Sequence, residues 1–334
     1  MERESGPEIV TRQPTRIPAA VVSNDLAAPA AIGSRWLADV CLLLTACMWG
    51  INIPVVKEAI SNLDPFLFNA LRLIFSVIAL GALVWLEGRF GEPQAWRVPW
   101  RQVLVFAGLA GFVYQIIFML AITRTTAGNT ALILSTMPMW TAILSYLFYH
   151  ERLPRVTWLG FAITFSGTIV VISSGGKLSY SAEHLYGNLF MLVAAMAWAG
   201  STVYSRPLMQ TISPLRLSFV SSVVTTPIHL LLLPLMMQFA TKEYPDWQAK
   251  LLEWQIVLAI LFSGAFSTGL AYFTWNLGVQ LVGGSHAAVY QNVVTLIAVL
   301  GGWLILGEKI LAAQIIGGIL IVAGLLVMRR GRKA

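Results

Sequence analysis

The sequence predicts an all-α integral membrane protein with ten transmembrane helices in two inverted five-helix repeats. Three observations lead to this fold class: the amino-acid composition, a series of ten long apolar segments, and matches between the two halves of the chain. Hydrophobic residues make up 57% of the 334 residues and charged residues 11%, against about 25% charged residues in average soluble domains. So few charges cannot cover a soluble protein of this length, which excludes a soluble enzyme, a disordered protein and a nucleic-acid binder.

The two ends of the chain differ in composition from the rest. Residues 1–35 contain four prolines, mixed charges and few aromatic side chains, which predicts a disordered cytoplasmic tail. This segment has no apolar core followed by a small-residue cleavage site, so it does not resemble a signal peptide. Residues 329–334 are predicted to form a short basic cytoplasmic tail.

Ten apolar segments lie between these tails, and each approaches the length of about 20 residues that a helix needs to cross a bilayer. Backbone polar groups in lipid must be satisfied within a segment, which favours helices over strands. The weakest boundary lies between the third and fourth segments, where only Arg124 and Gly128 interrupt the apolar pattern. The segments are residues 36–56, 64–86, 101–121, 126–148, 156–174, 186–205, 215–238, 255–277, 283–306 and 310–328.

Positive charges indicate the orientation of these segments, because cytoplasmic loops are enriched in Lys and Arg. With the N-terminus inside, 15 of the 22 Lys and Arg residues lie in cytoplasmic segments and 6 in external loops. Both termini are therefore expected in the cytoplasm. Short loops without targeting or N-glycosylation signals favour a multi-pass protein of a bacterial inner (plasma) membrane.

The two halves of the chain match one another at ordered positions. At an offset of 149 residues the matches are Trp49 with Trp198, Lys57 with Arg206 and Pro65 with Pro214; at an offset of 157 they are Glu151 with Glu308, Gly160 with Gly317 and Gly167 with Gly324. Since each half holds five spans, an odd number, the second half is inverted in the membrane. Inverted repeats are a transporter architecture, with the substrate site near the membrane midplane between the halves.

Several of these residues also carry a resemblance to a known family. Trp49-Gly50 lies late in the first span, Pro65 opens the second, and the fourth and ninth spans have acidic ends at Glu151 and Glu308. With the paired glycines, these features resemble the EamA-like branch of the drug/metabolite transporter superfamily over roughly residues 37–328. His150 departs from the Gly-Glu pattern that Gly307-Glu308 keeps. The resemblance implies EamA-like repeats at residues 36–174 and 186–328, in a carrier of amino acids or other small metabolites, often an exporter.

Arg72 is the strongest single indication of a binding site. It lies about eight residues into the second span, roughly 12 Å deep at about 1.5 Å per residue. A cation at that depth is costly and usually faces a cavity or a partner. One interpretation is a contact with a substrate carboxylate; the other is a snorkelling side chain or a structural partner of backbone carbonyls.

Other polar and aromatic side chains at comparable depth are candidates for lining a substrate cavity. His229 could relay a proton, although a neutral histidine bonding across helices is the favoured interpretation. Trp49 and Trp198 occupy equivalent repeat positions and could form apolar walls, or simply pack. The remaining predicted cavity residues are Asn52, Asn69, Tyr114, Gln115, Ser135, Tyr204, Tyr272, Tyr290, Gln291 and Asn292. Since residues 290–292 are consecutive on a helix, only one or two of them can face the cavity.

Several kinds of site are missing from the sequence. No Asp or Glu lies in the middle of a span, so proton coupling through a buried carboxylate has no candidate. No nucleotide-binding, zinc-protease or serine-hydrolase motif occurs. We therefore predict no catalytic residues, no metal and no cofactor. Glu151 and Glu308 are expected to anchor helix ends or gates, and the paired glycines to allow close helix contacts between halves or between protomers.

Together these observations predict a secondary transporter of small amphipathic metabolites that works by alternating access, and not an enzyme. Export is favoured by the family resemblance alone. The alternatives are a membrane-embedded enzyme acting on lipid and a channel. The expected partners are a small-molecule substrate and the lipid bilayer, without nucleic acid, in a monomer or a homodimer.

Overall fold

The structure of the protein is a computed structural model that describes residues 32–90, 98–149, 154–173, 182–240, 242–283, 287 and 290–331. All regular elements in these ranges are helices, and no strand occurs in them. The all-α fold class is therefore confirmed for the part of the chain that is described. Of the two predicted tails, residues 1–31 and 332–334 lie outside the described residues.

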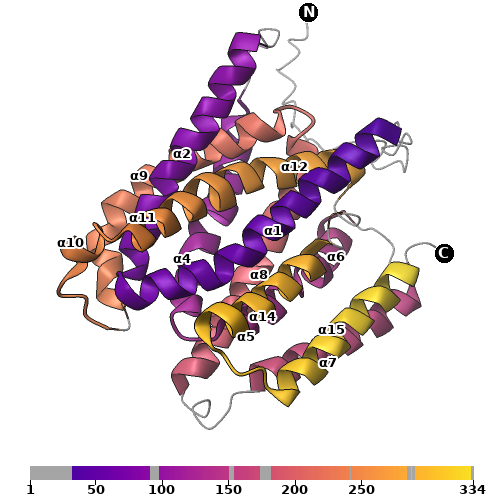
Figure 1. Ribbon diagram of the computed structural model, residues 1–334. Helices are drawn as coiled ribbons and strands as arrows, with labels where there is room; N and C mark the ends of the chain where they lie inside the picture. The colour runs from indigo at the N-terminus through magenta and orange to yellow at the C-terminus, as the bar shows by residue number, and fades with distance from the viewer. Residues whose placement is uncertain are drawn as a thin grey trace, which may run out of the picture.

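The described residues of the first half of the chain fold mainly into helices (Figure 1). Its second helix begins at Pro65, where the missing N–H would have had no helical partner. The Asp64 carboxylate accepts hydrogen bonds from the backbone N–H groups of Phe66 and Leu67, both at 2.9 Å, and so caps this helix. The elements are α1 (Ile32–Asn62), α2 (Pro65–Phe90), α3 (Trp100–Phe106), η3 (Ala107–Val113), α4 (Tyr114–Ile122), α5 (Ala127–Leu134), α6 (Met137–Tyr149) and α7 (Arg155–Ser173).

The second half repeats the pattern of a capped helix that starts with proline. Pro214 begins its second long helix, and the Ser213 hydroxyl accepts a hydrogen bond from the Arg216 backbone N–H at 3.3 Å. The elements are α8 (Ala182–Leu208), α9 (Pro214–Met236), η4 (Met237–Phe239), α10 (Trp247–Lys250), α11 (Trp254–Leu261), η5 (Phe262–Leu270), α12 (Ala271–Val282), α14 (Gln291–Leu306) and α15 (Ala312–Gly331).

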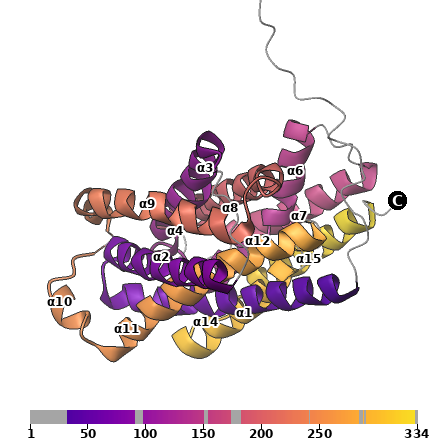
Figure 2. The same ribbon diagram turned by 90° about the horizontal axis from the view of Figure 1, so that it is seen from above.

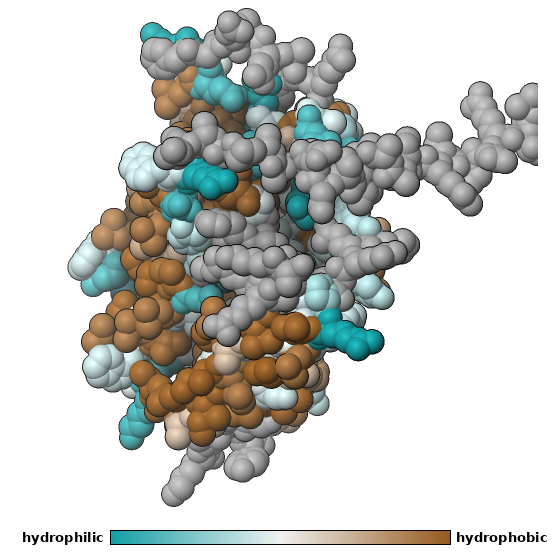
Figure 3. All heavy atoms as spheres, turned by 90° about the vertical axis from the view of Figure 1, so that its right-hand side faces the viewer, coloured by the Kyte–Doolittle hydropathy of each residue, from teal (hydrophilic) through white to brown (hydrophobic). Residues whose placement is uncertain are grey.

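Eight apolar helical stretches of 18–29 residues are long enough to cross a bilayer. They are Arg35–Asn62, Pro65–Arg89, Trp100–Ile122, Ala127–Tyr149, Arg155–Ile172, Ala182–Leu208, Pro214–Phe239 and Trp254–Val282. The ninth and tenth predicted segments contain shorter apolar helices, Gln291–Leu306 and Ala312–Met328, so the count of ten spans stays a prediction. Apolar side chains cover large parts of the outer surface (Figure 3), as lipid contact requires.

Two of these stretches contain π-helical segments, η3 and η5. Each lies in the third long apolar stretch of its half, η3 between α3 and α4 and η5 between α11 and α12. A π turn accommodates one extra residue and occurs frequently at functional sites. It also shifts the backbone hydrogen bonds, and in both segments a carbonyl receives a side chain from another helix. The Gly111 carbonyl lies 2.9 Å from His229 Nε2, and the Ser267 carbonyl accepts from Trp49 Nε1 at 2.9 Å.

The halves interlock rather than lie side by side. α1 packs against α12 and α14, and α2 packs against η5 and α9, so both opening helices of the first half contact the second half (Figures 1 and 2). Close approach of α2 and η5 depends on Gly264, because a Cβ atom there would lie 2.3 Å from the Arg72 carbonyl oxygen. This contact places η5 directly beside Arg72.

The paired glycines of α7 and α15 form a second contact between the halves. The two helices run side by side (Figure 1) and pack densely. A Cβ atom at Gly167 would lie 2.6 Å from the Gly317 carbonyl oxygen, and one at Gly324 would lie 2.6 Å from the Gly160 carbonyl oxygen. The glycines therefore serve the contact within one chain, which is the first of the two roles expected for them.

Candidate functional site

A cavity lies where the helices of the two halves meet. It leaves about 60 Å³ for the centres of water-sized molecules, and since one water needs about 10–15 Å³ by this measure, it has room for only a few. From the first half it is lined by side chains of α1, α2, α4, α5 and α6, and from the second half by side chains of α8, η5, α12 and α14. Anything larger than a few waters requires these helices to move apart.

Eight of the fourteen residues predicted from the sequence line this cavity: Trp49, Asn52, Arg72, Tyr114, Gln115, Trp198, Tyr272 and Gln291. Equivalent positions of the two halves meet there. Trp49 and Trp198 are related by the offset of 149 residues, and Leu134 and Gln291 by the offset of 157. The cavity therefore lies between matching parts of the two halves.

Arg72 is buried in the wall of the cavity, with 3% of its surface exposed. Its Nε donates to Asn69 Oδ1 at 3.0 Å, one terminal nitrogen donates to the Ser263 hydroxyl at 3.2 Å, and the other donates to Gln115 Oε1 at 2.6 Å. Gln115 in turn donates to the Tyr272 hydroxyl at 2.9 Å. All of these partners are neutral, so the guanidinium is positioned without its charge being balanced.

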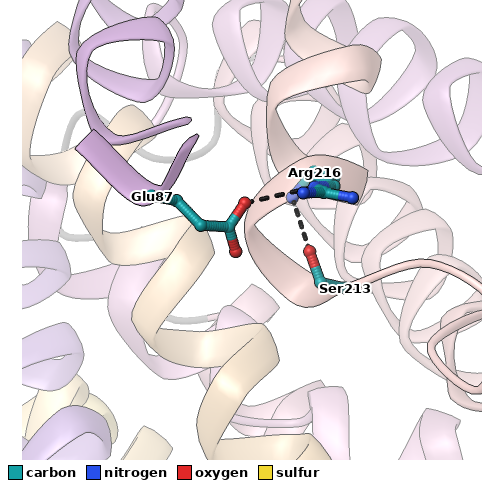
Figure 4. A network of polar contacts seen from close by, with 3 residues as sticks. All are labelled: Glu87, Ser213 and Arg216. Atoms are coloured by element: carbon teal, nitrogen blue, oxygen red, sulfur yellow. Dashed lines mark hydrogen bonds and ion pairs between the residues drawn. The ribbon is translucent and has the colours of Figure 1, made fainter. Parts of the chain in front are cut away.

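Arg216 is another buried arginine, and unlike Arg72 it has a carboxylate partner among the described residues. It lies in the first turn of α9, and its Nε lies 3.1 Å from a carboxylate oxygen of Glu87 near the end of α2 (Figure 4). This ion pair links the second helices of the two halves. Arg72 has no such partner, because no carboxylate lies within ion-pairing distance of it in the described ranges. A buried cation without a counter-charge is unfavourable unless an anion arrives to balance it.

Asn69 and His229 form a second layer behind Arg72. The His229 Nε2 faces the Gly111 carbonyl, which can only accept, so Nε2 carries the proton. His229 Nδ1 then accepts from Asn69 Nδ2 at 3.4 Å, which leaves Asn69 Oδ1 to accept from Arg72. The favoured interpretation of His229, a neutral side chain bonding across helices, agrees with this chain of bonds. Neither Asn69 nor His229 reaches the cavity wall.

An aromatic cluster forms another part of the wall. The Trp49 ring meets Trp198 at 87° and Tyr272 at 88°, with ring centroids 5.3 Å and 6.2 Å apart. Trp198 also contacts Tyr272 and Tyr114, with both centroid distances 5.0 Å. Edge-to-face contacts at these distances are favourable. The rings fill the space between them and present a rigid apolar surface to the cavity.

Three side chains on the cavity carry buried polar atoms without a hydrogen-bond partner among the described residues. They are Asn52 Oδ1, Trp198 Nε1 and Gln291 Nε2. Each of these residues is at most 6% exposed. Unsatisfied buried polar atoms are uncommon in folded proteins. Here they lie where a bound molecule or ordered water would supply the partners.

Four of the predicted residues lie elsewhere. The Ser135 hydroxyl donates to the Leu132 carbonyl at 2.7 Å, and the Tyr290 hydroxyl donates to Asp39 at 2.9 Å. Tyr204 and Asn292 are half-buried and do not line the cavity either. Of the three consecutive residues 290–292, Gln291 alone faces it. The other two point to different sides because successive helical residues are rotated by about 100°.

Sequence reasoning missed the hydroxyl residues of the wall, Ser267, Thr268 and Thr295. Serine and threonine in apolar helices usually bond to the preceding turn, as Thr295 does to the Gln291 carbonyl at 2.9 Å. Their residue types alone do not separate a cavity position from a packing position. The repeat offset of 157 was an available signal for part of the wall, since it relates Met137 to Val294.

A polar cluster closes the helix ends beyond the cavity. Lys57, one turn past Ile53 on α1, donates to the carbonyls of Ile122 and Thr125 at 2.6 Å each. Glu308 accepts from the backbone N–H groups of Ala127 and Gly128 at 2.8 Å and 3.1 Å, and so caps α5 from the second half. The sequence-based expectation for Glu308, a helix-end anchor, agrees with this geometry. Lys57 ties α1 to the end of α4 and to the turn before α5, and Glu308 ties the segment after α14 to the start of α5.

Comparison with known proteins gives the family. The EamA-like transporter family matches the chain twice, over residues 36–173 and 185–330. The chain belongs to this family. The EamA-like protein is 24% identical over 289 residues to the uncharacterized transporter YoaV of Bacillus subtilis, covering 85% of this chain and 94% of YoaV. It is 26% identical over 292 residues to a probable amino-acid metabolite efflux pump of Salmonella typhimurium, covering 85% and 92%.

A solved crystal structure shares the fold of this EamA-like protein. It superposes with a TM-score of 0.60 at 20% sequence identity and covers 88% of this chain and 95% of that one. The family and the apolar helices establish a multi-pass membrane protein of a transporter family.

Proposed function

We propose that the protein is a secondary transporter that carries small amphipathic metabolites, amino acids or related compounds, by alternating access at the cavity between its halves. The observation that carries this proposal is Arg72, a buried cation on the cavity wall whose partners are all neutral. A site of this kind suits a substrate with an acidic group and an apolar body, because the aromatic cluster lies on the same cavity.

Alternating access requires a site that is closed on one side at a time. The Lys57–Glu308 cluster supports this mechanism, because it lies one turn beyond the cavity and joins helices of both halves. The small cavity volume supports it as well, since binding requires the halves to separate. In the proposed topology, ten helices cross the membrane in two inverted repeats with both termini in the cytoplasm, so this cluster closes the external side.

Export as the direction of transport and the inner membrane as the location are parts of the same proposal. The name of the Salmonella typhimurium relative, a probable amino-acid metabolite efflux pump, supports them. The proposal commits to a carrier and not to an enzyme. A small-molecule substrate and the lipid bilayer are the proposed partners, in a monomer or homodimer.

The test is counterflow in liposomes that contain the purified full-length protein. A carrier exchanges labelled external substrate for unlabelled internal substrate, and the exchange rate saturates with concentration. We expect Arg72→Gln to abolish saturable exchange, and Arg216→Gln, a buried arginine outside the cavity, to retain it. Flux that never saturates would indicate a channel, and product formation without flux would indicate an enzyme; either result would refute the proposal.

A further inference from the structure

We infer that the cavity selects organic acids that carry one negative charge and an apolar body, and that it makes no use of an amino group. This inference rests on the proposed transport function and specifies the substrate class of the same site. It separates simple carboxylic acids from the amino acids that share their carbon skeletons.

The wall of the cavity is positively charged. Arg72 is the one charged residue among the described residues that line the cavity. Beyond the described ranges, the sequence offers no carboxylate to balance Arg72, because no Asp or Glu lies in the middle of any apolar segment. An empty cavity therefore has a net charge of about +1. A monocarboxylate brings this to zero, whereas a zwitterion leaves the positive charge uncompensated.

Hydrogen-bond donors outnumber acceptors among the groups that the wall offers to a bound molecule. Of the five N–H groups of Arg72, three have partners among the described residues, which leaves two. Trp198 Nε1 and Gln291 Nε2 are further donors that find no partner in the described part of the chain. The Tyr272 hydroxyl accepts from Gln115, which leaves its own proton to donate. Against these five donors stand three acceptors of the described wall: Asn52 Oδ1, which lacks a partner, and the hydroxyl oxygens of Thr268 and Thr295, whose own protons are donated to backbone carbonyls. Donors in excess bind a carboxylate and give an ammonium group few partners.

In the closed conformation, the aromatic cluster does not form a cage for an ammonium group. Such a cage needs rings that surround the cation, with the cation within about 6 Å of their centroids. The centroids of Trp49, Trp198 and Tyr272 are 5.0–6.2 Å apart, and their edges meet faces. Rings in such contact leave no room for a methylammonium group between them. They can offer only one outer surface, which suits the apolar body of a substrate.

An amino group in this cavity would therefore lose its water without gaining a counter-charge. A buried ammonium without a partner is strongly unfavourable. It would also lie near Arg72, a like charge, in surroundings that screen charges less than water does. Both effects act against amino acids and leave the corresponding deaminated acids unaffected. We expect a preference of at least tenfold for the acid.

The experiment compares matched probes on the purified full-length protein. One set is 3-phenylpropanoate, 3-phenylpropanamide, phenethylamine and phenylalanine; the other is 4-methylpentanoate and leucine, which share one carbon skeleton. Tryptophan fluorescence gives the dissociation constants, since Trp49 and Trp198 line the cavity. We expect each acid to bind at least tenfold more tightly than its amino acid, and phenethylamine not to compete. Equal or tighter binding of the amino acids, or no binding of either acid, would overturn the inference.

Variants of Arg72 test whether its charge causes the preference. The readout is the ratio of affinities for 3-phenylpropanoate and 3-phenylpropanamide within one protein sample, which a partial loss of folded protein does not change. We expect Arg72→Gln to bring this ratio close to one, and Arg72→Lys to keep the acid preferred because the charge remains. Arg216→Gln is the control and should behave like the unmodified protein. An acid preference that survives Arg72→Gln would contradict the inference.

Counterflow of the tightest probe separates this inference from the proposed function. If the amino acids bind best and are exchanged, the carrier stands and the inference about substrate charge fails. If the acids bind best but no saturable exchange occurs, the inference about substrate charge stands and the proposed carrier function fails.

Discussion

Gly264 lies at the closest approach of η5 to α2, and Gly264→Ala tests how the site is held together. A Cβ atom there would lie 2.3 Å from the Arg72 carbonyl oxygen and 2.8 Å from Phe75 Cβ. Ordinary van der Waals contact begins near 3.4 Å, so the two helices must separate by about 1.1 Å (3.4 − 2.3) at this point. The bond from Arg72 to the neighbouring Ser263 hydroxyl, already 3.2 Å long, would not survive that shift.

The expected magnitude follows from overpacking. One methyl group forced into a close-packed contact typically costs about 1–3 kcal/mol. A melting temperature changes by about 2–4 °C per kcal/mol in proteins of 150–250 residues, so we expect a decrease of several degrees. A misplacement of about 1 Å at a binding site can lower a rate by about 100-fold. We therefore expect the exchange rate in liposomes to fall more steeply than the stability.

Thermal unfolding in detergent and counterflow in liposomes measure the two effects. Gly108→Ala is the matched control: it lies in η3, the other π-helical segment, and a Cβ atom there meets nothing within 4 Å. It should leave both quantities unchanged or stabilise slightly. If Gly264→Ala and Gly108→Ala melt within one degree of each other and exchange substrate equally fast, the close contact of η5 and α2 does not position Arg72, and the reasoning fails.

Three further predictions concern other contacts. Glu308→Ala removes the cap of α5 and should lower the free energy of unfolding by about 1–2 kcal/mol, with Glu308→Gln intermediate; equal melting temperatures for all three proteins would contradict the capping role. His229→Phe should weaken acid binding through Asn69, while His229→Gln, which can still accept that bond, should weaken it less; the reverse order in a binding titration would refute the bond chain. Burial first, and then the nearby Asp64 carboxylate, raises the pKa of Tyr244 from 10.0 to about 12. Because the pKa of Tyr244 is higher in the folded than in the unfolded state, its contribution to the free energy of unfolding should be fully present below about pH 10 and decrease as the pH rises toward about 12. Chemical denaturation at a series of pH values should show this decrease in the unmodified protein and a smaller one in Tyr244→Phe. An equal decrease in both proteins would show that Tyr244 is not its source.

Much of the fold follows from apolar length. All ten predicted segments contain helices, because about 20 apolar residues without breaks have few other structures in lipid. The boundary judged weakest, near Arg124, is a real turn: Thr126 caps α5 by accepting from the Asn129 backbone N–H at 3.0 Å. A polar residue three positions after a threonine inside an apolar run was the available signal. The fourth segment contains a further break between Leu134 and Met137, which Pro138 in the first turn of α6 indicates, because proline cannot donate the backbone hydrogen bond that would continue the preceding helix.

The sequence predicted the site residues that are energetically costly to bury in a membrane, and it did not separate the less costly ones from packing residues. A cation deep in a span is costly and usually faces a cavity or a partner, and Arg72 lies on the cavity wall. Tyr204 and Tyr290 are common residues of apolar helices, and nothing local distinguishes them from Tyr114 or Tyr272. Which face of a helix a tyrosine occupies depends on the helical register. That register is altered by π turns, which the sequence pattern does not reveal.

The two π-helical segments make insertion into the membrane separable from assembly of the site. Each wide turn holds one residue more than an α-helix would, which rotates everything after it by about 100° but lengthens the helix by only about 1.5 Å. Deleting one residue from η3 would turn Gln115 away from Arg72, and deleting one from η5 would turn Tyr272 away. Either shortened chain keeps its apolar length and its charge distribution. An engineer could thus obtain a scaffold that enters the bilayer with the same topology and lacks the polar connection across its centre.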